Sequence, residues 1–251
     1  MVGVVMNKTK NWIIGRNSVK EALRAGRKIR KLYITKGQQS KGIQEIITQA
    51  EQGHIPLELI ATKDMDALFP TTRHQGIAAE SEPIVMVGLD SVLAMVEAKG
   101  ETPFLILLDG IEDVHNMGAI IRTAECAGAH SVLIPKRRSA PINETVGKTS
   151  AGAIEYMPLV SIGNVTQTVQ WLQKKGFWVI GADMSGSIEY DQADMTVPLV
   201  LVIGSEGKGI SPLVKKHCDL LVRIPMFGQV NSLNASVASA ILIYEAVRQR
   251  K

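Results

Sequence analysis

Cysteine is scarce in this chain, and the sequence contains no long apolar run. The 251 residues include two cysteines, Cys126 and Cys218, and neither belongs to a closely spaced pair of the kind that binds a metal. We interpret both thiols as reduced and buried. No apolar stretch approaches the ~20 residues that a membrane helix needs, and the first residues do not resemble a signal peptide. The sequence therefore predicts a cytoplasmic protein that binds neither a membrane nor a metal.

The charged residues are more informative in their clustering than in their total. Apolar residues make up 45% of the chain, which is typical of a globular protein with one or two domains. The net charge of +4 mildly favours an anionic partner. Five basic side chains lie within residues 24–31, and three more lie within residues 136–138. Either cluster is equally compatible with a solvated surface or with contacts to phosphates.

The pattern of apolar residues divides the chain into two domains. A tail of residues 1–11 precedes a small α/β domain over residues 12–83, and residues 84–102 form a linker with a short helix near 89–98. Residues 103–251 form the second domain. Within the first domain the spacing predicts helices near 15–26 and 42–53 and strands near 31–36 and 76–81.

From Pro103 onward, apolar strands alternate with helices. This alternation predicts a mostly parallel sheet that is covered by helices on both faces. Ligands of such sheets bind beyond the carboxyl ends of the strands, so the residues after each strand are candidates for a site. We expect strands near 104–110, 131–135, 156–160, 177–184, 198–204 and 220–225, and helices near 117–127, 144–151, 165–175, 211–217 and within 230–249.

Three of these strand ends are followed by small or polar residues. After the first strand, Asn116 is placed to cap a helix, and Gly118 leaves bare backbone one turn before Arg122. A capped helix with an exposed Arg122 is the simpler alternative. After the strand at 198–204, a glycine-rich loop carries Glu206, whose carboxylate would repel phosphate and suits a ligand with hydroxyl, amine or positive groups.

The third strand end carries three small polar residues, Asn231, Ser232 and Asn234, in front of a very apolar helix. One such residue caps a helix, and three are more than a cap needs. Because all three strand ends belong to one parallel sheet, we expect their loops to share a ligand.

The three motifs resemble those of the SpoU (TrmH) class of RNA ribose 2′-O-methyltransferases. They are N-x-G-x-x-x-R-T from Asn116, G-x-E-x-x-G from Gly204, and IPM from Ile224 followed by SLN-x-S-V-A from Ser232. The segments GRNSVKEAL and RHQGIAA are similar to the RNA-binding domain of the large-subunit ribosomal RNA guanosine methyltransferases of this class. Val114 stands where the family has proline, which predicts a looser turn.

The resemblance implies a fold, a cofactor and partners. The fold would be a C-terminal α/β trefoil-knot domain with a mostly parallel sheet, preceded by a small α/β RNA-binding domain like those of ribosomal proteins. The cofactor would be S-adenosyl-L-methionine (SAM), and the partners would be ribosomal RNA and a second copy of the chain. The implied catalytic residues are Arg122, Asn116, Glu206, Ser232 and Asn234, and the implied cofactor-binding residues are Gly204, Gly209, Ile224, Met226 and Leu233. We expect RNA contacts from Arg16, Arg27, Lys28, Arg30, Arg73, His74, Gln75, Lys136, Arg137 and Arg138.

Three alternatives remain at this point. The substrate could be transfer RNA, or the chain could be a non-catalytic RNA-binding or assembly factor with the same fold. A nicotinamide-dependent oxidoreductase is disfavoured because the first strand is not followed by G-x-G-x-x-G.

Overall fold

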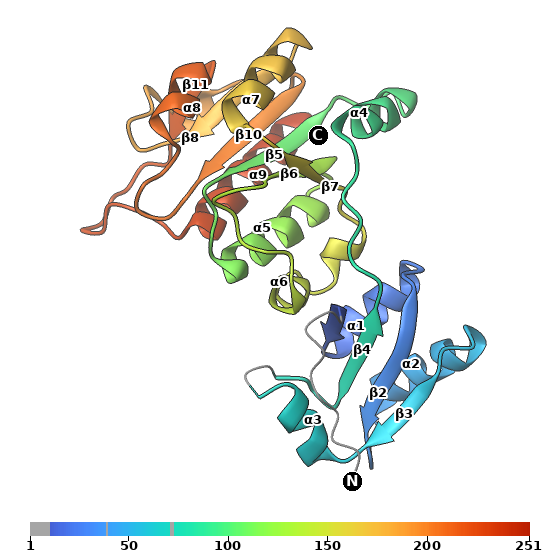
Figure 1. The fold of residues 1–251 in the computed structure, drawn as a ribbon. Coiled ribbons are helices and arrows are strands. Elements are labelled where there is room, and N and C mark those ends of the chain that lie inside the picture. The colour runs from blue at the N-terminus through green and yellow to red at the C-terminus, as the bar shows by residue number, and fades with distance from the viewer. Residues whose placement is uncertain (1–10, 39, 71–72) are drawn as a thin grey trace. The chain divides into compact units, whose positions relative to one another are not determined.

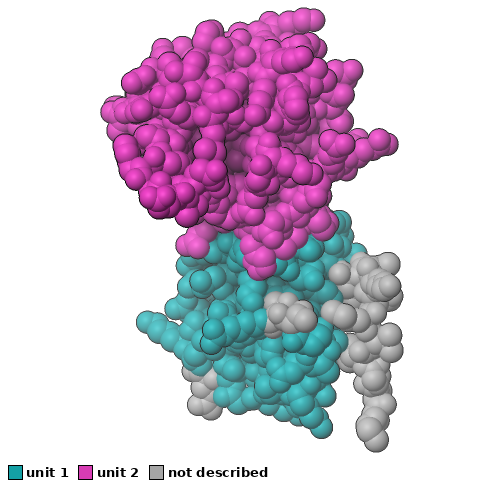
Figure 2. All heavy atoms as spheres, turned by 90° about the vertical axis from the view of Figure 1, so that its left-hand side faces the viewer, with its two compact units in different colours: residues 1–84, 142–156 teal, residues 85–141, 157–251 magenta. Residues whose placement is uncertain are grey.

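The computed structural model describes residues 11–38, 40–70 and 73–251, which fold as two units (Figure 1). The first unit comprises the described part of residues 1–84 together with residues 142–156, and the second comprises residues 85–141 and 157–251 (Figure 2). No helix in the described ranges is both long and apolar enough to span a bilayer.

The first unit is a four-stranded sheet with helices on both faces. Its strand order is β1-β4-β2-β3, in which β4 is antiparallel to β1 and β2, and β3 is parallel to β2. Side chains alternate across the sheet, so Leu32 and Ile34 pack with α1 and α2 while Tyr33 packs with α3. The elements are β1 (Asn11–Ile14), α1 (Arg16–Arg24), β2 (Ile29–Thr35), α2 (Lys41–Gln52), β3 (Leu57–Ile60), α3 (Thr62–Leu68) and β4 (Ile77–Ser81).

A segment from the second half of the chain completes the first unit. Residues 142–156 contain α6 (Glu144–Thr149) and a short 3₁₀ helix (Ala153–Glu155), and the sequence placed them in the second domain. Gly152 packs so closely on α1 that a Cβ atom there would lie 2.5 Å from Cβ of Glu21. The hydroxyl of Tyr156 donates to Oε2 of Glu21 at 2.8 Å. The segment is therefore held by α1, and the boundary between the units is not the one that the sequence suggests.

A buried ion pair joins this segment to the rest of the first unit. Nη1 of Arg27 lies 2.7 Å from Oε1 of Glu155, and the two side chains are 13% and 4% exposed. Arg27 also donates two hydrogen bonds to the carbonyl oxygen of Glu82. Burial raises the pKa of Glu155 above its usual value of 4.5, although Arg27 acts in the opposite direction.

We expect Glu155→Ala to destabilise the first unit by about 3 kcal/mol, because Arg27 would stay buried without its carboxylate. Urea denaturation followed by the fluorescence of Trp12, with Trp171 and Trp178 replaced by phenylalanine, measures this change. Glu45→Ala removes the exposed pair with Lys20 and serves as the control, with a much smaller expected effect. Equal shifts for the two variants would contradict a structural role for the buried pair.

The raised pKa of Glu155 gives this pair a pH dependence of known sign. The folded unit holds the proton of Glu155 more tightly than the unfolded chain, so its contribution to stability falls as pH rises from 4.5 through the raised pKa. We therefore expect the free energy of unfolding of the wild type to fall relative to that of Glu155→Gln as pH rises from 4.5 through the raised pKa. The same denaturation assay measures both.

The second unit is a seven-stranded sheet in which every recorded strand pair is parallel. The strand order is β7-β6-β5-β10-β8-β11-β9, which confirms the predicted α/β fold with a mostly parallel sheet. The trefoil knot that the resemblance implies stays a prediction, because strand order does not record which loop passes through another. The strands are β5 (Phe104–Asp109), β6 (Ser131–Pro135), β7 (Leu159–Ile162), β8 (Trp178–Ala182), β9 (Ile188–Glu189), β10 (Leu199–Gly204) and β11 (Leu220–Arg223).

Helices cover both faces of this sheet. Apolar side chains of α4, α7 and α8 form one core with β5, β6 and β10, whereas α5 and α9 pack against each other on the other face (Figure 1). The helix near 89–98, predicted in the linker, contributes Val92 and Val96 to this core. The helices are α4 (Leu89–Ala98), α5 (Val114–Cys126), α7 (Val165–Lys174), α8 (Pro212–His217) and α9 (Ala235–Arg250).

The cysteines differ from the prediction in their burial. Both are free thiols, but Cys126 is exposed and Cys218 is partly buried. Burial, with smaller contributions from Asp219, Asp109 and Asp183, raises the pKa of Cys218 to about 12. The prediction that both are buried is therefore wrong for Cys126, which lies at the last turn of α5 where one side of the helix faces solvent.

Candidate active site

Helix α5 begins three residues earlier than predicted, and this changes the role of Asn116. Asp113 is the N-cap, and its Oδ1 accepts a hydrogen bond from the backbone N–H of Asn116 at 2.7 Å. The prediction that Asn116 caps the helix is wrong. Because Asp113 satisfies the helix terminus, the amide of Asn116 is available for contacts outside its own helix, although the residue is only 7% exposed.

The three motifs meet at the carboxylate of Glu206. Its Oε1 accepts a hydrogen bond from Nδ2 of Asn116 at 2.9 Å and another from Nδ2 of Asn234. The same nitrogen of Asn234 also donates to Oδ1 of Asn116 at 2.9 Å. Side chains that are 90 and 118 residues apart in the chain are thus hydrogen-bonded to one another. The three loops that were expected to meet, those of Asn116, Glu206 and Ser232, are thus joined through Asn234, which lies in the same loop as Ser232, and the ligand that they would share stays a prediction.

Asn234 joins this cluster to helix α9. Its Oδ1 accepts hydrogen bonds from the backbone N–H groups of Ser236 at 2.9 Å and Val237 at 3.3 Å, so Asn234 is the N-cap of α9. The amide oxygen caps the helix while the amide nitrogen binds Glu206 and Asn116. Both ends of this amide are therefore used, which an aspartate of the same size could not do.

The loop after β10 is folded so tightly that it excludes a side chain at its first position. A Cβ atom on Gly204 would lie 2.1 Å from the carbonyl carbon of Gly209. Ser205 and Gly209 form a reciprocal pair of backbone hydrogen bonds of 3.0 and 2.9 Å. Gly207 and Gly209 have φ angles of 74° and 63°, a region that favours glycine. The three glycines let the loop turn back and present Glu206.

A cavity of about 310 Å³, here called cavity A, lies beside this loop. Its size falls at the lower end of the range for small-molecule sites. Its wall combines backbone of the glycine loop with the side chains of Ile203, Val222 and Ala238. All five residues predicted to bind the cofactor line cavity A, and so do Glu206 and Ser232; the five are Gly204, Gly209, Ile224, Met226 and Leu233.

Asp183 and Lys215 also line cavity A, although the sequence did not single them out. Nζ of Lys215 lies 2.5 Å from Oδ2 of Asp183. Burial would raise the pKa of Asp183, but hydrogen bonds from Lys215 and Ser185 outweigh it and lower the pKa. Asp183 is therefore a carboxylate at neutral pH. Asp183 directly follows the apolar strand β8, and this position after a strand was the sequence signal that could have identified it.

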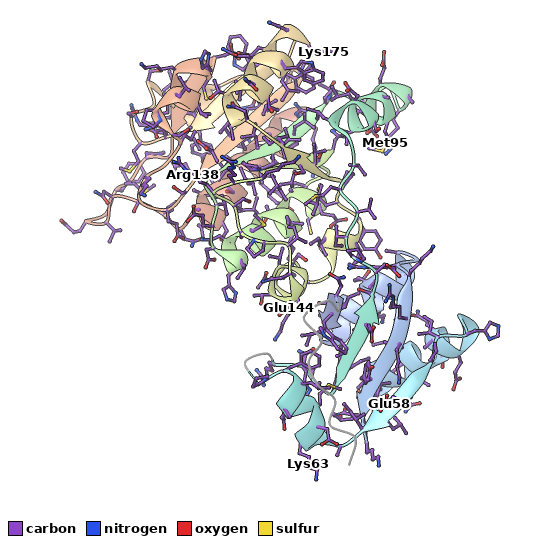
Figure 3. All side chains as sticks on the ribbon, in the orientation of Figure 1. Glu58, Lys63, Met95, Arg138, Glu144 and Lys175 are labelled. Carbon is purple, nitrogen blue, oxygen red and sulfur yellow. The ribbon has the colours of Figure 1, made fainter. Side chains whose placement is uncertain are left out.

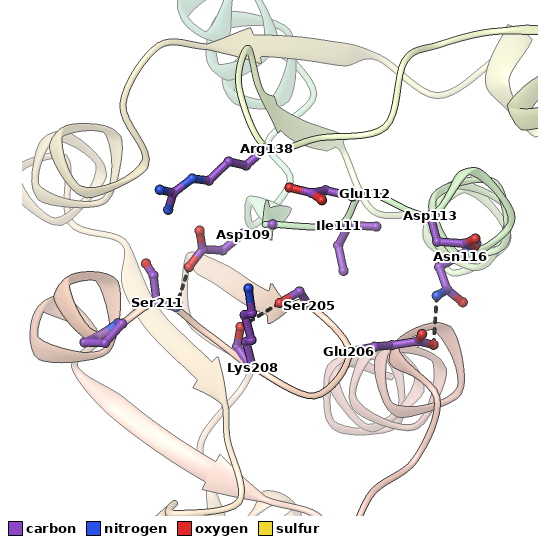
Figure 4. A pocket seen from close by; sticks show the side chains of 13 residues that line it. Asp109, Ile111, Glu112, Asp113, Asn116, Arg138, Ser205, Glu206, Lys208 and Ser211 are labelled. Carbon is purple, nitrogen blue, oxygen red and sulfur yellow. Dashed lines mark hydrogen bonds between the residues drawn. The ribbon is translucent and has the colours of Figure 1, made fainter.

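A second cavity of about 560 Å³, here called cavity B, lies against the same loop (Figure 4). It shares Ser205, Glu206, Lys208 and Gly209 with cavity A and is otherwise lined by residues that follow β5, together with Arg138 and the start of α8. Figure 4 shows Arg138, Glu112 and Asp109 directed toward a common space. The sequence had singled out Asn116, Glu206, Gly209 and Arg138 among these residues, but not Asp109, Glu112 or Lys208.

Asn234 lines neither cavity but is hydrogen-bonded to Glu206, whereas Arg122 lies outside both cavities and makes no hydrogen bond to this cluster. It is exposed on α5 and lines neither cavity A nor cavity B. It follows Asn116 by six residues, which corresponds to a rise of about 9 Å along the helix. Within the single chain, Arg122 forms no hydrogen bond or ion pair with Glu206 or Asn234.

The basic residues predicted to bind RNA fall into two groups in the first unit. One group is engaged within the protein: Arg27 pairs with Glu155, and Arg16 donates to the carbonyl of Gln75 at 3.2 Å. His74 is only 12% exposed, and its ring is fixed by Asp66 and by the N–H of Gly76. The other group, Lys28, Arg30 and Arg73, is exposed, although Arg30 pairs with Glu82.

The basic cluster of the second unit follows strand β6. Lys136, Arg137 and Arg138 are all exposed, and Figure 3 labels Arg138. Arg138 has a φ angle of 55° and lines cavity B. Of the basic residues predicted to bind RNA, it is the one that lines a cavity shared with Glu206.

One basic residue of the first unit was missed. Lys148 has its pKa lowered, first by burial and second by the positive charge of Arg73. It lies on α6, which the sequence assigned to the other domain, so no pattern in the sequence paired it with Arg73. In the described ranges, no group of three or more His, Cys, Asp or Glu side chains is placed to hold a metal ion.

Both units match known protein families. Residues 12–85 match the RNA 2′-O ribose methyltransferase substrate-binding domain, and residues 103–244 match the SpoU rRNA Methylase family. The chain is 40% identical over 245 residues to YacO of Bacillus subtilis (strain 168), which is assigned to the TrmH family of tRNA/rRNA methyltransferases. That alignment covers 98% of each chain.

Solved structures show the same fold. The SpoU methyltransferase AviRb from Streptomyces viridochromogenes, crystallised in complex with the cofactor AdoMet, superposes with a TM-score of 0.80 at 25% identity. The match covers 99% of this chain and 95% of AviRb. The TrmH/SpoU tRNA modifying enzyme of A. aeolicus matches 64% of this chain and 84% of its own, with a TM-score of 0.55 at 28% identity. Two domain matches in the expected order and a relative that is similar over its full length show that this chain belongs to the SpoU (TrmH) family of RNA methyltransferases.

Proposed function

We propose that this protein transfers a methyl group from SAM to the ribose 2′-oxygen of a guanosine in large-subunit ribosomal RNA, in the cytoplasm. The observation that carries the proposal is the hydrogen-bonded cluster of Asn116, Glu206 and Asn234, of which Glu206 lines cavity A. It joins the three family motifs at one point, beside a cavity of suitable size for a small cofactor.

The residues of cavity A fit SAM. Its wall offers backbone groups of the glycine loop and apolar side chains, and it contains no cradle for phosphates, which SAM lacks. When bound, SAM supplies a methyl group on a positively charged sulfur. The carboxylates of Glu206 and Asp183 in the wall complement that charge. Gly204, Ile224 and Leu233 would hold the cofactor through their main chains.

Arg122 is the proposed stabiliser of the reaction. A ribose hydroxyl is a weak nucleophile, and negative charge develops on its oxygen as it attacks. A guanidinium is protonated at all physiological pH values, so Arg122 suits charge stabilisation better than it suits general-base catalysis. Asn116, Ser232 and Asn234 would position the ribose and the cofactor around it.

The exposed basic residues would bind the RNA backbone. Lys136, Arg137 and Arg138 in the second unit, and Lys28 and Arg73 in the first, are free of the buried contacts that occupy Arg27 and His74. Contacts of this kind position an RNA without reading its sequence. They also make the affinity fall steeply with salt.

Helix α9 provides a surface for a second copy of the chain. Val237 and Tyr244, seven residues apart and therefore on one face of the helix, are 48% and 50% exposed. Leu233 before the helix is 38% exposed, and Phe227 and Val230 in the preceding loop are more exposed still. A homodimer through this surface would remove these apolar side chains from water.

Ribosomal RNA is favoured over transfer RNA as the substrate. Residues 103–244 match the SpoU rRNA Methylase family, whereas the tRNA modifying enzyme of A. aeolicus matches only 64% of this chain. The substrate-binding domain over residues 12–85 would serve the larger RNA. Transfer RNA remains the second candidate because the B. subtilis relative is assigned to a tRNA/rRNA family.

The proposal is tested by two measurements on the full chain. Calorimetric titration with SAM should show saturable binding, which separates an enzyme from a non-catalytic assembly factor. Methyl transfer from labelled SAM should then modify ribosomal RNA taken from cells that lack the gene, and not their transfer RNA. Binding of SAM without transfer to any cellular RNA would contradict the enzymatic function.

Asn234→Asp is expected to weaken SAM binding by about tenfold to a hundredfold. The change keeps the cap on α9 but removes the donor to Glu206 and places a second carboxylate beside it. Calorimetry with SAM measures the loss. Asn231→Asp introduces the same charge three residues away, at a side chain that is not hydrogen-bonded to Glu206, and is the matched control. Equal affinities for the two variants would refute the role of the cluster in shaping cavity A.

A further inference from the structure

Cavity B adjoins the proposed cofactor site but has a different chemical character. The two cavities share the loop residues Ser205, Glu206, Lys208 and Gly209, so a molecule in cavity B lies across this loop from a molecule in cavity A. A volume of about 560 Å³ is suited to a ligand larger than a single ion. If cavity A holds the methyl donor, cavity B is placed to hold part of the acceptor.

The side chains around cavity B are rich in carboxylates. Asp109 at the end of β5, Glu112 and Asp113 after it, and Glu206 line cavity B, while Lys208 and Arg138 supply two positive charges. A phosphate group would be repelled by this excess of negative charge. Groups that carry N–H donors would be attracted. The part of an RNA that presents such donors is the edge of a base.

Three of these carboxylates already accept hydrogen bonds from the protein. Oδ2 of Asp109 accepts from the N–H of Ser211 at 2.7 Å, Oδ1 of Asp113 accepts from the N–H of Asn116 at 2.7 Å, and Oε1 of Glu206 accepts from two amides. Glu112 differs, because within the described ranges it is exposed and takes part in no recorded hydrogen bond or ion pair. Its two oxygens are therefore available to a ligand, and Figure 4 shows them directed into the cavity.

We propose that cavity B receives the base of the nucleotide that is methylated, and that Glu112 selects guanine. This inference rests on the proposed function, and it adds a base-reading residue to it. Guanine presents two neighbouring donors, the N1–H and the 2-amino group, which match the two oxygens of one carboxylate. Adenine and cytosine each present an amino group beside an acceptor, and uracil presents one N–H between two acceptors. Only guanine satisfies both oxygens of Glu112.

Arg138 lines cavity B and is exposed. It also lines a neighbouring cavity of about 480 Å³, to which Arg137 and Asn164 contribute. A base held by Glu112 would thus have its flanking backbone next to two exposed arginines. The carboxylate of Glu112 would read the base, and the two arginines would contact the phosphates.

The experiment uses short RNAs, so it does not require the natural substrate. Full-length protein saturated with S-adenosylhomocysteine is titrated with the trinucleotides UGU, UIU and UAU, in which I is inosine, guanosine without its 2-amino group. Binding is followed by the NMR signal of the Ile111 methyl group, which lines cavity B. We expect UGU to bind at least about tenfold more tightly than UIU, because loss of the amino group leaves one oxygen of Glu112 without a donor. UAU should bind no better than UIU.

The variant Glu112→Gln separates base reading from general binding. It should remove most of the preference for UGU over UIU while leaving the affinity for S-adenosylhomocysteine unchanged. Glu97→Gln, which alters an exposed carboxylate of α4 outside all the cavities described here, is the control and should keep the full preference.

The outcomes distinguish this proposal from the proposed function. A wild-type protein that binds the cofactor and methylates RNA, but binds UGU and UIU equally or leaves the Ile111 signal unmoved at millimolar trinucleotide, would overturn the role of Glu112 and cavity B. A preference that survives in Glu112→Gln would do the same. Failure to bind the cofactor at all would instead count against the proposed function.

Discussion

Replacing Gly204 with alanine is expected to abolish cofactor binding. The added Cβ would lie 2.1 Å from the carbonyl carbon of Gly209 and 2.3 Å from the nitrogen of Ile210. These are backbone atoms, so no rotation of a side chain can relieve the overlap. The loop must move, and it carries both the wall of cavity A and Glu206. We expect the affinity for SAM, measured by calorimetry, to fall at least about a hundredfold, or ~2.7 kcal/mol.

A matched control for this variant is Gly163→Ala. Gly163 follows β7 at the same edge of the sheet, its φ angle is not positive, and a Cβ atom there meets nothing within 4 Å. This variant should bind SAM like the wild type. If Gly204→Ala also keeps its affinity, the loop is adaptable and is not the rigid support that its hydrogen bonds indicate.

Replacing Arg122 with alanine is expected to lower the rate of methyl transfer about a thousandfold. Removal of a group that stabilises developing charge costs about a hundredfold to a thousandfold in enzymes of other kinds. Arg122 is exposed and lines neither cavity, so neither folding nor SAM affinity should change. Single-turnover transfer to ribosomal RNA gives the rate, and calorimetry with SAM confirms that the cofactor site is intact. Activity within a few-fold of the wild type would remove Arg122 from the mechanism.

Mixed dimers test where Arg122 acts. Arg122 lies on α5, which packs on α9, and α9 carries the proposed dimer surface. We expect mixtures of Arg122→Ala and Gly204→Ala to recover part of the activity that each lacks alone, because one copy would supply the arginine and the other the cofactor. Mixtures as inactive as the separate variants would place Arg122 at the cofactor site of its own chain.

Periodicity predicted most of the elements of the second unit within a few residues. The helix near 89–98 coincides with α4, and the strand near 131–135 coincides with β6. The short elements β1, β3, β9 and α3 were not predicted, since two to seven residues carry too little of a repeating pattern to be recognised. The start of α5 was misplaced because Asp113 and Asn116 are both good caps, and only the path of the chain decides between them.

The roles of single polar residues depended on long-range contacts. Arg27 belongs to a basic cluster in the sequence, but in the structure it is buried against Glu155, 128 residues away. Glu112 and Asp183 follow strands as other site residues do, but that position alone does not separate them from ordinary loop carboxylates. Their importance follows from the cavities that they line.

The sequence by itself determined the α/β class, the parallel sheet and the three motifs, because these depend on local patterns of apolar residues and on short strings of particular side chains. Only the tertiary structure decided that residues 142–156 fold with the first unit, that Asp113 rather than Asn116 caps α5, and that Arg122 lies outside both cavities. Those outcomes depend on contacts between residues far apart in the chain. A helix cap, a buried ion pair and a cavity wall each need a partner whose position is set by the whole fold and not by its neighbours in sequence.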